Sequence, residues 1–289
     1  MNKYLIVNAD DYAYAEGVSR GIVYGAQAGV ITATGILANG VCLKEQLAML
    51  DCCETLDLGV HLTLTSGKPL SDEMRLLLQE SGRDTLYESK YSLVRQLVTG
   101  KLPLDAVRCE WSCQIKKCLE FKPTMKFLNS HEHVHMFPAL FRLVEDLAEQ
   151  YGIEHVRRVA AERPSLSMSS MFRMALIGML DVSVFFSSRR NNHIRKAPKM
   201  LGASVSGKLN SHFLENIFSR LKPGRVYELM CHPGFRVVGQ IDNPKLLQFH
   251  DWDGELLSLV HSLRNELLQK HGIRLTRYSE LNSILGGKL

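Results

Sequence analysis

The chain lacks the long apolar run of a membrane-spanning helix, which needs about 18 or more consecutive residues without charge. The strongest candidate, residues 171–186, is interrupted by Arg173 and Asp181. Residues 1–3 lead directly into a short strand pattern, which is too short for the apolar core of a signal peptide. These absences exclude a membrane-spanning protein and predict a cytoplasmic one.

A strong charge of one sign is absent too. The formal net charge is +5 over 289 residues, and the basic residues are spread along the chain with one local cluster, so no nucleic-acid footprint is indicated. Linkers, internal repeats and low-complexity segments are missing as well. With 45% hydrophobic and 22% charged residues, the composition is that of a globular protein with room for one barrel-sized α/β core. We therefore expect a single domain over 1–289.

No pair of cysteines has the C-x-x-C spacing of a zinc or redox motif. The seven cysteines are an odd number, which argues against a framework of disulfides. We expect most of them to be free, buried thiols in a reducing compartment, in agreement with a cytoplasmic location.

Hydrophobic spacing predicts strands that alternate with helices, which is typical of a mainly parallel sheet. Residues 66–102 form a polar, irregular insertion with short helices, and residues 187–199 form a basic loop. The expected strands are 4–7, 31–38, 57–64, 125–128, 155–159 and 225–231, and the expected helices are 16–28, 43–50, 103–121, 137–152, 170–180 (mostly buried) and 254–270 (capped by Asp253).

Polar side chains stand at or near the ends of several of these strands. Asp10 and Asp11 follow the first strand, and His61, His131 and His232 lie at later strand ends. An open doubly wound sheet and a barrel both fit the alternation, but only a closed barrel gathers all strand ends around one mouth. The sequence therefore favours a TIM-barrel-like (β/α) barrel, a seven-stranded or irregular version included.

Imidazole and carboxylate groups are the usual ligands of a catalytic divalent ion, which leaves positions open for water and substrate. Asp11, His61 and His131 would supply two imidazoles and one carboxylate. A lone histidine in an apolar strand is more often a hydrogen-bonded core residue. Several strand ends that all carry ligand-type residues are harder to explain in that way. Within the H-x-H-x-H run, we expect one ligand, with His133 and His135 supporting it.

Four segments in this order resemble the YdjC-like carbohydrate deacetylase family, which includes chitooligosaccharide deacetylases: NADD, GVHLTLT with Gly-Lys-Pro, SHEHVHMFP and ELMCHPG. The similarity spans residues 4 to 236 and implies a (β/α) barrel that hydrolyses N-acetyl groups on amino sugars. It also implies one divalent metal ion, Mg²⁺, on Asp11, His61 and His131, whereas the ligand types alone suit Zn²⁺. Asp10 then matches the general base and His232 the general acid.

The sequence departs from the family pattern at Asn129 and Glu132, where the family run usually reads D-S-H-H-H-V-H. We expect these two residues, with His133 and His135, around the ligands or at the substrate. The basic loop is first of all a solvated loop. Its anion-binding alternative would use Arg189, Arg190 and Arg195 against the non-reacting part of the substrate.

Two other functions remain open at this point. A metal-dependent phosphoesterase on a similar barrel would need a second ion, and a catalytically silent sugar-binding protein would not need Asp10 and His232. The expected partner is an amino sugar or a glycoconjugate. A homodimer is left open as the alternative to a monomer.

Overall fold

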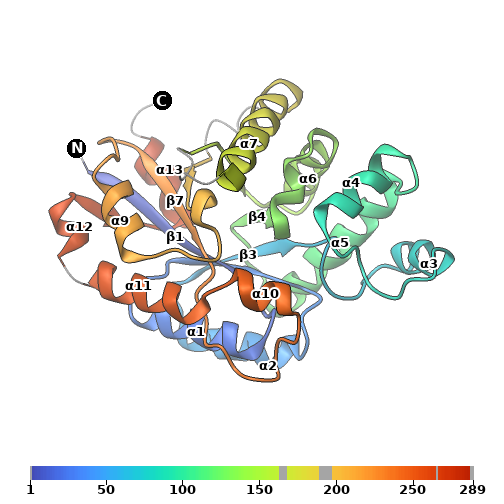
Figure 1. Cartoon of the computed structure of the whole chain (residues 1–289), viewed down its shortest axis with the longest axis horizontal. Coiled ribbons are helices and arrows are strands. Elements are labelled where there is room, and N and C mark those ends of the chain that lie inside the picture. Colours follow the sequence, from blue (N-terminus) through green and yellow to red (C-terminus); the bar gives the residue numbers. More distant parts are fainter. Residues whose placement is uncertain (1, 163–167, 189–196, 265, 287–289) are drawn as a thin grey trace.

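A computed structural model of the chain describes residues 2–162, 168–188, 197–264 and 266–286 (Figure 1). Eight strands form one sheet in which every pairing is parallel. The strands are β1 (Lys3–Tyr12), β2 (Ala33–Ile36), β3 (Asp57–Leu62), β4 (Phe127–Ser130), β5 (His155–Val156), β6 (Lys199–Leu201), β7 (Val226–Cys231) and β8 (Ile273–Leu275).

The sheet is curled, with helices around it, in a (β/α) barrel-like arrangement. Seven strands follow the order β5-β4-β3-β2-β1-β7-β6, and β8 pairs with β1 beside them. Within the described residues no pairing joins the edge strands β5 and β6, so the barrel stays open there. The predicted (β/α) barrel class is confirmed, in its irregular seven-stranded version.

Helices cover the outside of the sheet, with α1, α2 and α11 on one side and α5, α6 and α7 towards the other (Figure 1). None of the helices in the described ranges is both long and apolar enough to cross a membrane. The α-helices are α1 (Glu16–Gln27), α2 (Leu43–Ala48), α3 (Asp72–Glu80), α4 (Lys90–Val98), α5 (Leu104–Phe121), α6 (Pro138–Gln150), α7 (Met168–Ser187), α9 (Ser211–Phe218), α10 (Pro244–Phe249), α11 (Trp252–Arg264), α12 (Leu267–Lys270) and α13 (Leu281–Leu285). The 3₁₀ turns are η1 (Met49–Cys52), η2 (His131–Met136), η3 (Ala203–Val205) and η4 (Tyr278–Glu280).

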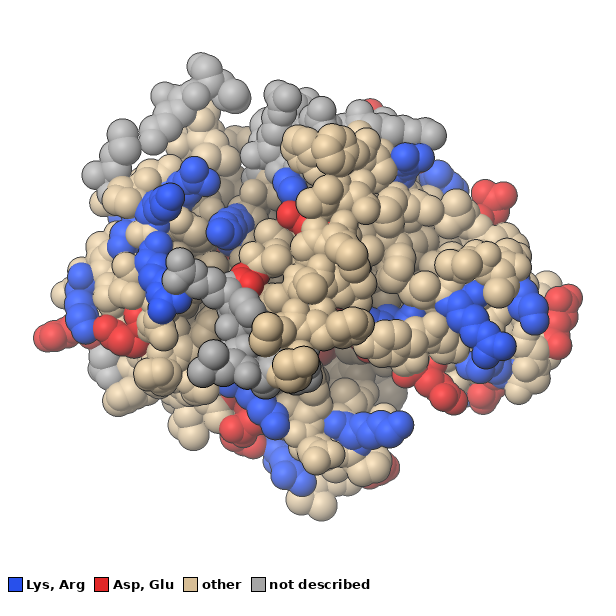
Figure 2. All heavy atoms as spheres, turned by 45° about the horizontal axis from the view of Figure 1, so that its top comes forward, with Lys and Arg blue, Asp and Glu red and all other residues tan. Residues whose placement is uncertain are grey.

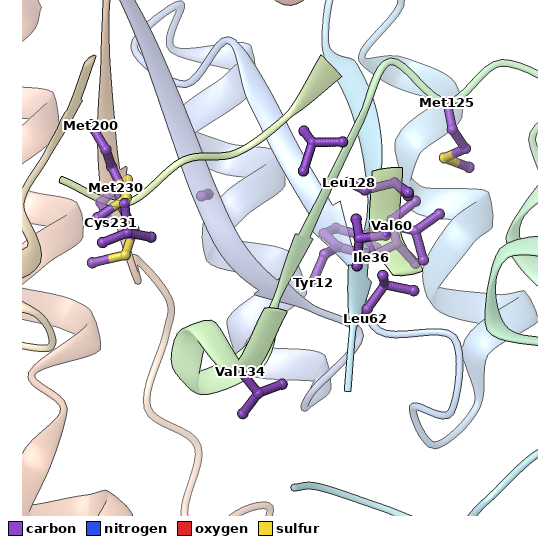
Figure 3. Close-up of a cluster of buried hydrophobic side chains, with 14 of the residues drawn as sticks. Tyr12, Ile36, Val60, Leu62, Met125, Leu128, Val134, Met200, Met230 and Cys231 are labelled. Atoms are coloured by element: carbon purple, nitrogen blue, oxygen red, sulfur yellow. The ribbon is translucent and has the colours of Figure 1, made fainter. Parts of the chain in front are cut away.

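The long strands are buried on both faces, as expected for a parallel sheet covered by helices. Figure 3 shows Tyr12, Ile36, Val60 and Leu62 from β1, β2 and β3 packed together with Leu128 of β4. A second group lies on β6 and β7, where Met200, Met230 and Cys231 meet. The core thus fixes the strands whose ends carry the polar side chains.

The insertion 66–102 is more regular than predicted, because it contains two capped helices. The Ser71 hydroxyl accepts a hydrogen bond from the Met74 N–H at the start of α3, and Ser89 does the same for Ser92 in α4. These two caps explain why a polar segment folds into helices.

Four other expectations were wrong. The cysteines were expected to be mostly buried, but only Cys118 and Cys231 are buried. The helix at 170–180 was expected to be mostly buried, but α7 exposes a large apolar surface. The helix expected at 254–270 is split into α11 and α12. Asp253 is not its cap, because α11 begins at Trp252 and the Gly254 N–H is bonded to the Asp251 carboxylate at 3.2 Å.

The strands β6 and β8 were missed, since three residues are too few for a periodic pattern.

Candidate active site

The two acidic residues lie on a bulge at the end of β1. Ala9 pairs with Thr34 of β2 and Tyr12 pairs with Ile36, so β1 has one residue more than β2 between these pairs. Asp11 adopts a left-handed backbone with φ of +68°, which Asp tolerates better than most residues. At this bulge the two carboxylates point in different directions. Asp10 contacts Arg157, whereas Asp11 contacts His61 and His131.

Asn129 of β4 is oriented by its neighbours. Its Nδ2 donates to Asp10 Oδ1 at 2.9 Å, and since a carboxylate only accepts, this contact identifies the amide nitrogen. The amide oxygen therefore faces His61 Nδ1 at 2.8 Å. Gly35 of β2 leaves room for this contact, because a Cβ there would lie 3.1 Å from the Asn129 oxygen.

This orientation fixes the tautomer of His61. An amide oxygen only accepts, so His61 Nδ1 carries the hydrogen and Nε2 of the neutral ring carries a lone pair. Nε2 lies 3.2 Å from Asp11 Oδ1, which is also an acceptor. Two buried acceptors at this distance repel each other unless a second proton or a metal ion supplies positive charge between them. A cation held between the two side chains would remove this repulsion.

His131 completes the group. It begins η2 after β4, and its Nδ1 lies 2.9 Å from the same Asp11 oxygen. Ligand atoms of Asp11, His61 and His131 all lie within 4.8 Å of one another, so one divalent ion fits this donor set. Burial raises the pKa of Asp11, but the two histidines outweigh it and hold the pKa well below its ordinary value. Burial lowers the pKa of His131, and the Asp11 charge reverses this to a raised pKa.

Asp10 has a different environment, made of hydrogen-bond donors. Arg157 binds both of its oxygens, at 2.5 and 2.9 Å, and Asn8 Nδ2 donates at 2.7 Å. Arg157 also donates from Nε to Glu228 of β7 at 2.6 Å. Burial raises the pKa of Asp10, but the Arg157 guanidinium outweighs it, and the pKa falls to about 2. Asp10 is thus an ionised carboxylate held in a fixed direction.

The remaining members of the histidine run have separate places. Both ring nitrogens of His135 are hydrogen-bonded, one to the Ser130 hydroxyl at 2.6 Å and the other to the Arg157 carbonyl at 2.9 Å. His135 thus connects η2 to the end of β4 and to the segment after β5. His133 has a φ of +56°, and its buried Nδ1 has no partner among the described residues. Burial and the Arg157 charge hold the pKa of His133 well below its ordinary value. Glu132 faces the insertion, where it accepts the Lys90 N–H at 2.8 Å.

His232 follows β7 and is 8% exposed. Its backbone N–H donates to the buried Glu255 carboxylate at 2.5 Å, which fixes the start of this loop. Its ring lies 4.9 Å from the ring of His250, which stacks on Trp252 at 5.0 Å. Burial, together with the charge of His232, lowers the pKa of His250 to about 3, so His250 is neutral at pH 7.

Comparison with known proteins assigns the family. The family model described as YdjC-like protein matches residues 4–270. The chain belongs to the YdjC-like family. A carbohydrate deacetylase of Geobacillus stearothermophilus is 30% identical over 81% of this chain and 81% of its own length. A chitooligosaccharide deacetylase of Escherichia fergusonii is 32% identical over 81% of this chain and 83% of its own length.

The YdjC-like fold is also shared with a solved structure. A protein of Enterococcus faecalis named for cellobiose-phosphate cleavage superposes with a TM-score of 0.69 and 23% identity. The superposition covers 97% of this chain and 99% of that one, so the two share the whole fold.

In this YdjC-like chain, the structure brings together the three expected ligands and places Asn129 directly behind one of them. Glu132 does not join them. Arg189, Arg190 and Arg195 lie outside the described residues, so their contact with an anion stays a prediction. Sequence reasoning missed Arg157, Glu228 and His250. Charged residues inside otherwise apolar strand segments, VRRV and VYELM, were the available signal for the first two.

Proposed function

We propose that the protein is a metal-dependent hydrolase that removes the N-acetyl group from an N-acetylated amino sugar, in an oligosaccharide or a glycoconjugate. The observation that carries this proposal is the buried group of Asp11, His61 and His131, in which a lone pair of His61 faces the Asp11 carboxylate. The relatives named as carbohydrate and chitooligosaccharide deacetylases supply the reaction class.

One divalent ion would be held by these three side chains. Such an ion polarises an amide carbonyl and acidifies a water, which is what a poorly electrophilic acetamide needs. Two imidazoles and one carboxylate suit Zn²⁺ on ligand grounds, while the family resemblance implies Mg²⁺.

Asp10 and His232 would move the protons. With a pKa of about 2, Asp10 is ionised at neutral pH and can accept the proton of the attacking water, but it holds that proton only briefly. Arg157 and Asn8 keep its oxygens aimed while this happens. His232 would donate a proton to the departing amine, without which the amine leaves poorly.

The phosphoesterase alternative has less support. It calls for two ions about 4 Å apart and therefore for a second ligand set. Among the described residues, a single such group is found, and His135 is already bonded on both nitrogens. A silent sugar-binding protein would not require Asp10 to be held by four hydrogen bonds beside the ligands.

The test is acetate release from a panel of N-acetylglucosamine conjugates, with Zn²⁺, Mg²⁺ or a chelator. We expect metal-dependent release that His61→Ala abolishes. His212→Ala is the matched control, since His212 is exposed on α9 and is not part of the group of Asp11, His61 and His131. Release of phosphate from sugar phosphates, without acetate from any conjugate, would refute the proposal in favour of the phosphoesterase.

A further inference from the structure

A buried layer of charge lies inside the open barrel, between its apolar end and the candidate active site. The apolar end is a cluster at the amino ends of the strands, where Ala33, Phe127 and Val226 are the first residues of β2, β4 and β7. Two residues after Val226, Glu228 pairs with Arg157, which follows β5, and both side chains are buried. On the face drawn in Figure 2, by contrast, the Lys and Arg side chains stand out at the surface.

Arg157 reaches across the open side of the barrel. Its strand, β5, is one end of the strand order, and β7 lies next to the other end. The backbone N–H of Arg157 donates to the Leu128 carbonyl of β4 at 2.9 Å, whereas its side chain donates from Nε to Glu228 Oε1 at 2.6 Å. The pair therefore joins two parts of the sheet that are not neighbours in the strand order.

Asp10 depends on this arginine for one of its two oxygens. Asn8 and Asn129 both donate to Oδ1, at 2.7 and 2.9 Å. Arg157 also donates to Oδ1, from Nη2 at 2.9 Å. Among the described residues, Oδ2 receives a hydrogen bond from Arg157 Nη1 alone, at 2.5 Å. The orientation of the Asp10 carboxylate is thus set by the guanidinium.

The guanidinium is in turn held by Glu228. Arginine has a long side chain with many rotamers, so its two bonds to Asp10 are well defined only when the side chain is fixed elsewhere. Glu228 contacts Nε, on a different edge of the guanidinium from the one that faces Asp10. A buried ion pair is often no more stabilising than apolar residues of similar volume, so stability alone does not explain a glutamate at this position.

We propose that Glu228 is a positioning residue for the hydrolysis, which fixes Arg157 so that both oxygens of Asp10 stay directed towards the attacking water. This inference rests on the proposed role of Asp10 as the general base. Glu228 acts by accepting a hydrogen bond, because Asp10 already balances the charge of Arg157. Glutamine can accept the same bond, whereas methionine, which is unbranched and of similar size, cannot.

The first test is the kinetics of acetate release by Glu228→Met and Glu228→Gln. We expect Glu228→Met to lower kcat by about 10- to 100-fold with KM unchanged, because it removes the support of a group that acts in the transition state. Glu228→Gln should restore kcat to nearly the wild-type value. Asp57→Leu is the matched control, since Asp57 is also a buried acid that accepts a hydrogen bond, from the Ser279 N–H, but stands at the amino end of β3. It should keep the wild-type kcat.

The second test does not depend on activity. Crystal structures of the two Glu228 variants should show that Arg157 keeps both bonds to Asp10 in Glu228→Gln and loses the bond to Oδ2 in Glu228→Met. Both bonds intact in Glu228→Met, or a wild-type kcat for this variant, would overturn the proposal. Equal losses of kcat in both variants would show that the charge of Glu228 acts instead of its hydrogen bond. If the wild type releases no acetate from any conjugate, the proposed function fails, and the crystal structures still decide whether Glu228 positions Asp10.

Discussion

Asn129 connects the two halves of the site, so its substitution should change the metal affinity through a single side chain. Its oxygen accepts from His61 Nδ1 and its nitrogen donates to Asp10. Asn129→Ala removes the group that holds the His61 ring and its tautomer. Loss of such a supporting hydrogen bond costs about 10- to 100-fold in metal affinity, or roughly 1.4–2.7 kcal/mol. This agrees with about 1.5–3 kcal/mol for a hydrogen bond to a charged group.

Asn8 provides the matched control. It is as buried as Asn129 and donates to the same Asp10 oxygen at 2.7 Å, but among the described residues it makes no hydrogen bond to His61. We therefore expect Asn8→Ala to disturb Asp10 and to keep the metal affinity of the wild type. The assay is calorimetric titration of the metal-free proteins with Zn²⁺, after thermal unfolding has shown that both variants are folded. Equal metal affinities in the two variants would refute the argument from the His61 tautomer.

Three further outcomes follow from the site. Asp10→Asn should keep the metal and lose turnover by about 10²- to 10⁴-fold, as expected for a removed general base, whereas Asp11→Asn should lose metal in elemental analysis; the reverse pattern would exchange the two roles. The pKa of His250 is about 3 in the folded protein against an ordinary 6.5, so as the pH falls the unfolded chain takes up this proton before the folded protein does. The contribution of His250 to the free energy of unfolding is therefore most favourable above pH 6.5 and decreases as the pH falls towards 3. His250→Gln should flatten that part of the pH dependence in denaturant titrations, and an unchanged slope would contradict the assignment. Neutralising the three arginines of the loop 187–199 should raise KM for the true substrate and spare a minimal sugar, and equal kinetics on both would leave a solvated loop.

The group of Asp11, His61 and His131 was predictable because each of these residues stands at or near the end of a strand of the parallel sheet. Parallel strands end on one edge, so a polar residue at each strand end predicts a common site even before the strand order is known. Asp11, His61 and His131 came together for this reason. The family resemblance then indicated the chemistry, which strand ends alone do not specify.

The partners of these residues were not predictable in the same way. Arg157 reaches Asp10 from the end of β5, and no local pattern states which buried carboxylate a buried arginine will meet. His250 lies just after α10, in a polar stretch without periodicity, and its ring stacks on Trp252 and lies beside the ring of His232. Local sequence patterns therefore do not predict these contacts.

The exposed face of α7 was wrongly predicted for a related reason. Its composition is mostly apolar, which is typical of a buried helix. Whether a helix is covered depends on what packs over it, and within this chain nothing in the described residues covers Phe172 or Phe186.

The metal ion proposed for Asp11, His61 and His131 can be located by experiment. X-ray diffraction from crystals soaked in Zn²⁺, collected on both sides of the zinc absorption edge, tests it most directly. We expect one strong anomalous peak at about 2.0–2.2 Å from His61 Nε2 and from an oxygen of Asp11. No peak between these three side chains, or a peak at Cys52 and Cys53 alone, would contradict it.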